Sequence, residues 1–391
     1  MPKRLARIMS PKVTERSQAD EVARRLGALP LRHLDWTLIS LTFFLVAFGM
    51  LMQYSATRTD IPGNPAYYVI RQGLASFIGI PLMAACIALD YRRLKVATFF
   101  IYGIFLFFLL VVFFTEATMG SQRWIQLGPF NFQPSEFCKL VLVLVLANYL
   151  SESRTDPHTL RWFAIPVAWS LPYMVLVFFQ PDLGTTLVMA AILLGMLFLA
   201  GCRMRHWLGL LGAGTLAFVL GFAFKLFKPY QIERFTAFLR QDVGVQEAGY
   251  QLMQSKIAIG SGQLVGKGLF HGTQTHLNFI PAHHTDFIFA VIGEELGLVG
   301  ALLLIGAFAL LIWRFLRIAN NARDLYGAMI VLGITTMFAF QIAVNIGMTI
   351  GIMPITGIPL PFISYGGSSL MVCLAAVGLA QSVHLRRFSQ I

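Results

Sequence analysis

A carboxylate stands at the entrance of an apolar run in PAHHTDFIFAVIGEELG, residues 281–297. Asp286 precedes the run, and in a helix Glu294 would lie about 12 Å deeper. A carboxylate within reach of water can remove a proton from an acceptor hydroxyl, so Asp286 is the candidate general base. The simpler alternative is that Asp286 only caps a helix. We assign Glu294 and Glu295 to holding helices together or to polarising a cavity.

Two apolar runs begin with Gln and Pro followed by an acid. QPSEFCKL contains Glu136 and Lys139, and QPDLGTT contains Asp182; Pro and acids favour helix N-termini. Glu136 and Lys139 are three positions apart, so they share one helix face. Their pairing would either let both charges enter the bilayer, where each alone costs about 2.5–3.5 kcal/mol, or line a polar cavity. The sequence leaves both alternatives open.

Two irregular stretches add candidate groups for binding an anion. YQLMQSKIAIGSGQLVGKGLF supplies Lys256 and Lys267 among several glycines, but the glycines do not match a nucleotide-binding P-loop. IMPITGIPLPFISYGGSSL, residues 352–370, is rich in proline and glycine. Non-helical backbone at membrane depth must line a protein-covered or water-filled cavity, and Ser364, Ser368 and Ser369 would cap the helix that follows.

The elements that must position these residues are membrane helices. The 391 residues are 57% hydrophobic and only 12% charged, against about a quarter charged in soluble proteins. The sequence therefore predicts an all-α integral membrane protein with about ten transmembrane helices. Apolar runs of spanning length occur at about 36–54, 73–89, 96–114, 135–150, 163–179, 184–201, 207–224, 287–313, 325–350 and 369–385.

The distribution of basic residues predicts the topology. One side of the membrane receives 20 of the 30 Lys and Arg residues, so that side and both termini are expected to be cytoplasmic. Residues 1–34 would form a cytoplasmic tail, or in part an amphipathic helix on the lipid surface, and 35–391 a polytopic membrane domain. A large outer loop, about 225–286, would connect helices 7 and 8. Topology explains the basic residues, and no nucleic acid partner is expected.

The irregular regions face the outer side, so we predict one polar cavity there. Its mixture of carboxylates, cations and helix N-termini suits a phosphorylated lipid. The candidate residues are Asp286, Arg123, Glu136, Lys139, Asp182, Lys256, Lys267, His284, Ser364 and Ser368.

Five segments resemble, in sequence and order, the hallmark segments of the SEDS (shape, elongation, division, sporulation) family over about residues 36–388. They are RWIQLGPFNFQPSEFCKL, QPDLGTT, YQLMQSKIAIGSG, HTDFIFAVIGEELG and PLPFISYGGSS. GKGLFHGTQTHLNFIP and NIGMTIGIMPITGIPLPF look more like elongation-type than division-type members. The resemblance implies a peptidoglycan glycosyltransferase of the bacterial inner membrane. Such an enzyme polymerises lipid II at the outer face and works with a class B penicillin-binding protein transpeptidase.

The resemblance also implies roles for individual residues. Asp286 would be the catalytic acid or base, and Arg123, Glu136, Lys139 and Asp182 would line the cavity. Sugar transfer from a lipid pyrophosphate needs a base together with groups that neutralise the departing charge.

The histidines beside Asp286 do not have the spacing of a zinc site. The cofactor that the chemistry allows is a divalent cation, Mg²⁺ or Mn²⁺, bound with the pyrophosphate, and no organic cofactor is expected. His284 is therefore taken as a substrate-binding residue. Ala282 and His283 depart from the Glu-Arg or Glu-Ala that relatives commonly carry before His-Thr-Asp, which alters the charge next to the catalytic loop.

The alternative function is a flippase or transporter for a lipid-linked precursor. Broken helices and intramembrane charges are also found in transporters. Against this alternative, the polar residues cluster on the outer side, and no inverted repeat is evident beyond the two Gln-Pro-acid starts. A non-catalytic scaffold, the third possibility, would need none of these buried charges.

Overall fold

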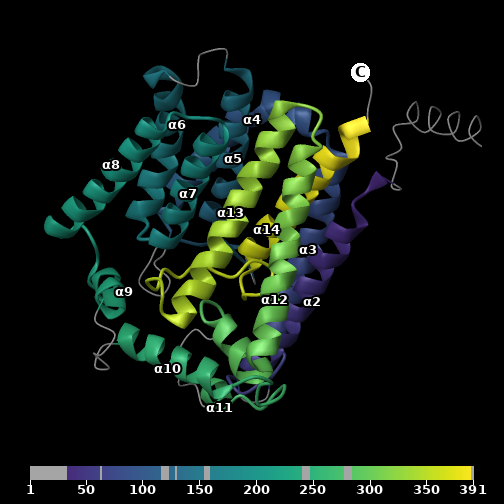
Figure 1. Ribbon diagram of the computed structural model, residues 1–391, viewed down its shortest axis with the longest axis vertical. Helices are drawn as coiled ribbons and strands as arrows, with labels where there is room; N and C mark the ends of the chain where they lie inside the picture. Colours follow the sequence, from purple (N-terminus) through teal and green to yellow (C-terminus); the bar gives the residue numbers. More distant parts are fainter. Residues whose placement is uncertain are drawn as a thin grey trace, which may run out of the picture.

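The computed structural model describes residues 33–61, 64–115, 123–127, 130–153, 159–239, 247–276 and 284–388. These residues form a bundle of helices with one short β-hairpin (Figure 1). Nine of the described helices are long and apolar enough to cross a membrane, and a tenth apolar helix has 17 residues. The prediction of an all-α membrane protein with about ten spans is confirmed.

The membrane-spanning candidates follow the predicted apolar runs. Their bounds are α2 Trp36–Thr57, α3 Tyr67–Ala88, α4 Tyr91–Val112, α5 Pro134–Glu152, α6 Leu160–Phe179, α7 Leu183–Leu199, α8 Met204–Ala223, α12 Ile288–Asn320, α13 Leu325–Ile350 and α14 Gly367–Leu385. A 3₁₀ turn, η3 Arg386–Phe388, follows α14.

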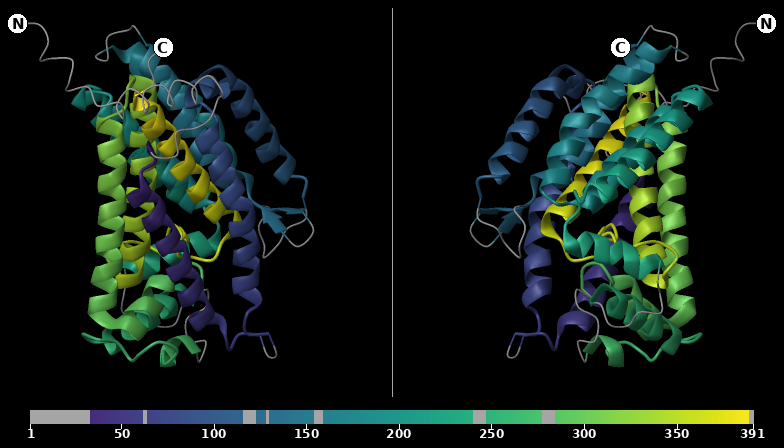
Figure 2. Two further views of the ribbon diagram at one scale, coloured as in Figure 1. Left: turned by 90° about the vertical axis from the view of Figure 1, so that its right-hand side faces the viewer. Right: turned by 90° about the vertical axis from the view of Figure 1, so that its left-hand side faces the viewer.

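Two helices form the centre of the bundle, and one lies at its edge (Figures 1 and 2). The most apolar window of α14 is 94% buried inside the protein and that of α5 is 83% buried, against 6% for α8. The central helices can therefore carry polar side chains away from lipid, and α5 carries Glu136 and Lys139. The peripheral helices expose large apolar residues such as Phe77, Phe107 and Leu303, which suits contact with lipid.

The predicted outer loop is partly helical. Its described residues contain α9 Pro229–Leu239, α10 Glu247–Ser261 and α11 Thr273–His276. In Figure 1, α9 lies at the lower left of the bundle, and α10 and α11 lie along its lower end. The start of α2 and the end of α14 lie together at the opposite end (Figure 2). The predicted tail lies outside the described residues up to position 32.

A short hairpin that the sequence did not predict precedes α5. Strands β1 Ile125–Leu127 and β2 Phe130–Phe132 are antiparallel. The aromatic ring of Phe132 lies against Phe108 and Phe137, with centroids 6.1 and 5.1 Å away. The hairpin thereby holds the chain that enters α5.

Helix α12 is broken at Gly297, whose φ of 65° and ψ of −162° are not helical. The N–H groups of Leu298 and Val299 donate instead to the carbonyls of Gln263 and Leu264, at 2.9 and 3.1 Å. A break in a membrane helix is tolerated where other backbone satisfies the freed groups. The loop after α10 provides this backbone.

The loop after α10 also donates hydrogen bonds to the carbonyl groups that precede the break. The N–H groups of Lys267 and Gly268 donate to the carbonyls of Glu294 and Glu295, at 3.0 and 2.9 Å. Such close approach requires glycine, because a Cβ at Gly266 would lie 2.2 Å from the carbonyl oxygen of Glu295. The outer loop and α12 are therefore joined through their backbones.

We expect Gly297→Ala to destabilise the protein. The backbone region of Gly297 is essentially restricted to glycine, and strain of this kind costs about 1–3 kcal/mol. A Cβ there would also lie 2.4 Å from the backbone nitrogen of Gly266. Gly306→Ala, in the same helix, is the matched control because a Cβ there meets nothing within 4 Å. Thermal unfolding in detergent should show a lower melting temperature for Gly297→Ala only; equal melting of both variants would contradict this account.

Candidate active site

Asp286 lies in the turn before α12, where its carboxylate is partly buried. A Cβ at Gly357 would lie 3.3 Å from Oδ2 of Asp286 and 3.1 Å from Nη1 of Arg234 on α9. Because Gly357 has no side chain, the Asp286 carboxylate and the Arg234 guanidinium can both lie next to its Cα. Burial raises the pKa of Asp286; Arg234 and Arg123 oppose this rise, and Asp182 adds to it.

Asn345 of α13 fixes the backbone on both sides of this point. Its Nδ2 donates to the carbonyl of Asp286 at 3.0 Å and to the carbonyl of Ile358 at 2.8 Å. The side chain of Asn345 is fully buried. One amide thus sets the spacing between the Asp286 turn and the irregular segment 352–366.

Ser364 and Tyr365 connect the same segment to the residues just before Asp286. Oγ of Ser364 donates to the carbonyl of Thr285 at 2.6 Å, and the N–H of Tyr365 donates to the carbonyl of His284 at 2.9 Å. The His284 ring lies 4.6 Å from the ring of Tyr68 and 5.7 Å from that of Tyr365 between centroids. His284 therefore belongs to an aromatic cluster beside the Asp286 turn.

Asp182 is buried and caps α7. Its carboxylate accepts from the N–H and Oγ1 of Thr185, at 3.1 and 2.9 Å, and from Nε2 of Gln133 at 3.1 Å. The last bond connects the two Gln-Pro-acid segments of the sequence. Both oxygens of Asp182 thus have fixed donors. Asp182 acts on Asp286 through its charge, which raises the pKa of Asp286.

Arg123 ties the hairpin to the turn between α6 and α7. Its guanidinium donates to the carbonyls of Gln180, at 3.0 Å, and Pro181, and to the hydroxyl of Tyr230 at 3.0 Å. The Tyr230 hydroxyl donates to the Pro181 carbonyl as well, at 2.8 Å. Arg123 therefore holds α9 near the start of α7, and its charge acts on Asp286.

Glu136 and Lys139 form a buried ion pair on α5. Nζ of Lys139 lies 2.8 Å from Oε1 of Glu136, and the side chains are 2% and 6% exposed. Oε2 of Glu136 has no hydrogen-bond partner among the described residues. The N-terminal end of α5 favours this carboxylate.

The other two predicted cations are engaged elsewhere. Nζ of Lys267 lies 2.7 Å from both Oε1 of Glu294 and Oγ1 of Thr273. Lys256 belongs to α10, and its side chain reaches the C-terminal end of α13. A Cβ at Gly351 would lie 2.8 Å from Nζ of Lys256. Lys267 is thus paired with Glu294, and the side chain of Lys256 lies beside Gly351.

Glu294 and Glu295 hold separate elements together, which is one of the two roles that the sequence left open. Glu294 accepts from Lys267 and from the N–H of Gln274 at 2.9 Å. Both carboxylate oxygens of Glu295 lie within 2.7 Å of Oγ of Ser55 on α2. The two acids thus tie α12 to the outer loop and to α2.

The expectation that Ser364 and Ser368 cap the last helix is wrong. The N-cap of α14 is Gly366, which makes no side-chain capping bond. Oγ of Ser368 instead accepts from the N–H of Gln133 and donates to the carbonyl of Asn131, at 3.0 and 3.1 Å. The Ser368 hydroxyl is therefore bonded to the backbone between β2 and α5, a contact that the sequence did not predict.

Sequence reasoning missed three residues that shape the site. Gln133 and Asn345 carried a signal, because Gln133 stands in a Gln-Pro-acid segment and Asn345 is polar within an apolar run. Arg234 carried none, since only the fold brings α9 to Asp286. Within the described residues, no group of three or more His, Cys, Asp and Glu side chains could hold a metal ion.

Comparison with known proteins identifies the family. The family described as "Cell cycle protein", which groups FtsW, RodA and SpoVE proteins, matches residues 35–388. The chain belongs to this family, the SEDS family. The nine helices of spanning length among the described residues and this membership identify a multi-pass protein of the bacterial inner membrane.

Curated relatives are similar over nearly their whole length. Stage V sporulation protein E of Bacillus subtilis is 38% identical over 89% of this chain and 96% of its own. The probable peptidoglycan glycosyltransferase FtsW of Trichlorobacter lovleyi is 36% identical over 90% and 93%. Peptidoglycan glycosyltransferase MrdB of Escherichia coli is 37% identical over 91% and 94%.

Solved structures share the fold. A chain from a structure described as "Structural coordination of polymerization and crosslinking by a peptidoglycan synthase complex" matches with a TM-score of 0.77 and 33% identity, covering 91% of this chain and 99% of its own. The rod shape determining protein RodA of Thermus thermophilus matches with a TM-score of 0.68 and 31% identity, covering 91% and 98%.

We expect Lys139→Ala to lower the free energy of unfolding by about 3–5 kcal/mol, because it leaves a buried carboxylate unpaired. The double variant Glu136→Gln/Lys139→Met should recover most of this loss. Lys95→Ala is the control: the Lys95–Glu152 pair has the same 2.8 Å separation but is 32% and 62% exposed, and such pairs contribute about 0–1 kcal/mol. Thermal unfolding in detergent measures all three, and equal melting of Lys139→Ala and Lys95→Ala would refute the stabilising role of the buried pair.

Proposed function

We propose that the chain is a peptidoglycan glycosyltransferase that polymerises lipid II at the outer face of the inner membrane. The observation that carries this proposal is the partly buried Asp286 carboxylate at the outer end of α12, which two arginines influence electrostatically. Transfer of a sugar from a lipid pyrophosphate requires such a base next to positive charge. Relatives named as peptidoglycan glycosyltransferases support it.

In this mechanism Asp286 accepts the proton of the acceptor sugar hydroxyl. The hydroxyl oxygen forms a bond to the anomeric carbon of the donor, and the bond from that carbon to the pyrophosphate oxygen breaks. Arg234 is suited to meet the departing charge, because its guanidinium lies over the ring of Tyr230 at 5.7 Å and forms no ion pair within the described residues. Arg123 adds positive charge but is held by backbone carbonyls.

The raised pKa of Asp286 suits this role. A general base works best when its pKa lies near the working pH. Burial moves the pKa of Asp286 upward, and the two arginines oppose this rise. The proposed substrate contacts extend to the Glu136–Lys139 pair, Lys256, Lys267, His284, Ser364 and Ser368 as the sequence suggested. A divalent cation, Mg²⁺ or Mn²⁺, carried by the pyrophosphate would add to the positive charge, and no step above depends on it.

The proposed partner is a class B penicillin-binding protein transpeptidase. A similar chain was solved within a complex described as coordinating polymerization and crosslinking. The partner's single membrane helix would pack on an apolar helix face, with its outer part near the loop of residues 225–285. Helix α8 offers such a face, since it is largely exposed.

The proposed setting is cell elongation. The segments GKGLFHGTQTHLNFIP and NIGMTIGIMPITGIPLPF support this assignment by their likeness to elongation-type members. The similarity to the rod shape determining protein RodA of Thermus thermophilus supports it. Relatives named FtsW and Stage V sporulation protein E are similar to the same degree as MrdB, so the assignment rests on these segments.

A flippase for the lipid-linked precursor is the competing function, because the broken helix α12 is also a transporter feature. Polymer formation from purified lipid II in detergent separates the two functions, since no transport step limits it there. Absence of polymer from the unmodified protein with its partner would favour the flippase.

We expect Asp286→Asn to lower the rate of polymer formation about 10²–10⁴-fold, the usual contribution of a positioned acid or base. The substitution keeps the shape of the side chain, so melting temperature and lipid II binding should be retained. Glu233→Gln, a carboxylate change on α9, is the control and should polymerise at a near-normal rate. Near-normal polymerisation by a folded Asp286→Asn protein would remove Asp286 from the catalytic role.

We expect Arg234→Gln to shift the acidic limb of the pH–rate profile to higher pH. Arg234 lowers the pKa of Asp286, so its removal raises that pKa, and the unprotonated base is then lost at a higher pH as the solution is acidified. The rate should recover at alkaline pH to the extent that Arg234 acts through Asp286. Lys228→Gln, at an exposed position nearby, should leave the limb in place; a shift toward lower pH in Arg234→Gln would contradict the assignment.

A further inference from the structure

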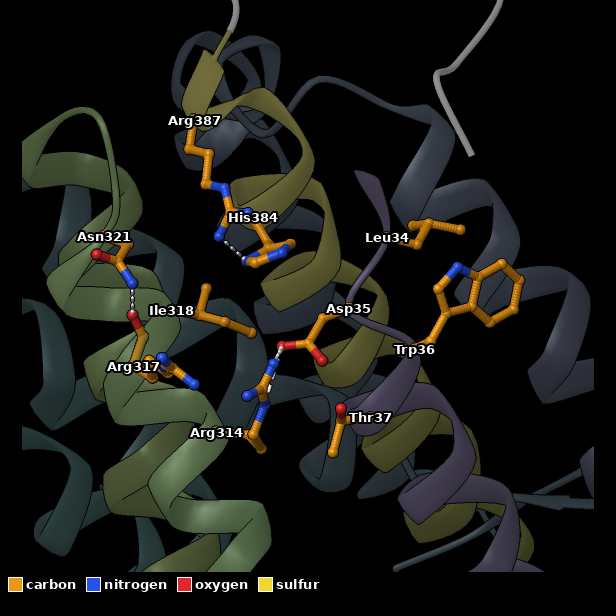
Figure 3. A pocket seen from close by; sticks show the side chains of 10 residues that line it. All are labelled: Leu34, Asp35, Trp36, Thr37, Arg314, Arg317, Ile318, Asn321, His384 and Arg387. Atoms are coloured by element: carbon orange, nitrogen blue, oxygen red, sulfur yellow. Dashed lines mark hydrogen bonds and ion pairs between the residues drawn. The ribbon is translucent and has the colours of Figure 1, made fainter. Parts of the chain in front are cut away.

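A cavity of about 380 Å³ lies at the opposite end of α12 from Asp286 (Figure 3). The start of α2 and the ends of α12 and α14 form its walls, with side chains that include Asp35, Arg314, Arg317, His384 and Arg387. This volume is within the range of about 300–1,000 Å³ that is usual for sites of small ligands. The proposed glycosyl transfer makes no use of this cavity.

One of its three arginines is neutralised. Arg314 donates to Oδ2 of Asp35 through Nε at 3.1 Å and through Nη2, and the side chain of Asp35 is 1% exposed. Asp35 also accepts from the N–H of Leu38 and so caps α2. The pair is therefore a structural link between α2 and α12 and contributes no net charge to the cavity.

The other two arginines, Arg317 and Arg387, place two further cations in the walls of the cavity. Arg317 is exposed, lies 5.2 Å from the centre of the Trp313 ring, and forms no ion pair in the part of the chain that the structure describes. Arg387 donates to Nδ1 of His384 at 3.1 Å. Burial lowers the pKa of Arg387, and Arg314 and Arg317 lower it further while Asp35 opposes them. An anion in the cavity would relieve this repulsion.

Two tryptophans indicate that the cavity lies at the level of lipid headgroups. Trp36 lines the cavity and is 60% exposed, and Trp313, beside Arg317, is 50% exposed. Exposed tryptophans concentrate at membrane–water interfaces. The basic loops of the sequence gather at this end of the bundle, which assigns it to the cytoplasmic leaflet.

We propose that this cavity binds the phosphate group of an anionic phospholipid of the cytoplasmic leaflet through Arg317 and Arg387. Guanidinium groups bind phosphate oxygens through paired, charge-assisted hydrogen bonds, and basic pockets between membrane helices on the cytoplasmic side suit such headgroups. The bound lipid joins the ends of α2, α12 and α14. A free phosphate shares this chemistry, but the exposed Trp36 favours a ligand that also reaches the lipid phase.

The test compares lipids and variants of the full-length protein in detergent. Thermal unfolding is followed while phosphatidylglycerol, phosphatidylcholine or inorganic phosphate is added, and native mass spectrometry measures the fraction that retains one lipid. A ligand that binds the folded state raises its melting temperature. The variants are Arg317→Gln and Arg317→Gln/Arg387→Gln. The control is Arg323→Gln, an exposed arginine at the same end that lies outside the cavity.

We expect phosphatidylglycerol, but not phosphatidylcholine or phosphate, to raise the melting temperature of the unmodified and Arg323→Gln proteins. Its apparent affinity should fall roughly fivefold in Arg317→Gln and about 25-fold in the double variant, since each cation near the surface contributes about a factor of five. Because Arg317 is exposed, its single variant should fold normally. Equal stabilisation by phosphatidylcholine, equal binding by the double variant, or full reproduction of the effect by phosphate would overturn the proposal.

Discussion

The structure depends on the requirement that backbone polar groups within a bilayer find their partners inside the protein, because each unsatisfied group costs several kcal/mol. The irregular segment 352–366 meets this requirement through buried amides on neighbouring helices. Gln53 of α2 donates to the carbonyl of Ile363 at 2.7 Å. Gln72 of α3 accepts from the N–H of Gly366 at 3.2 Å. With Asn345 of α13, these side chains allow a non-helical wall to stand beside Asp286.

The carboxylates of Asp182 and Asp286 have different surroundings. Asp182 has both oxygens occupied by fixed donors, whereas Asp286 faces Arg234 across the space left by Gly357. Carboxylates whose surroundings differ in this way take different roles. Asp182, whose oxygens are hydrogen-bonded, raises the pKa of Asp286; in the proposed mechanism it is Asp286 that exchanges the proton.

The sequence predicts the features that depend on local composition. Hydropathy located the apolar helices, and the Gln-Pro-acid segments located the starts of α5 and α7. The break at Gly297 was not predicted, because the chain contains 34 glycines and only the packed loop 262–268 shows which of them interrupts a helix. The approach of Arg234 to Asp286 and the pairing of Lys267 with Glu294 were missed for the same reason. Each joins residues whose proximity arises from the tertiary fold.

The break at Gly297 also explains how α12 carries two glutamates near its N-terminal end. Residues 298–320 would be about 35 Å long at 1.5 Å per residue, close to the thickness of a hydrocarbon core of about 30 Å. Residues 288–295, which precede the break, are all buried within the protein. Exposed apolar positions such as Leu303 recur after the break. The part of α12 after Gly297 is therefore the lipid-facing span. The part before Gly297 is enclosed by the loop after α10 and by α2. Glu294 and Glu295 meet donors there, and Asp286 lies partly buried in the turn just before this part of the helix.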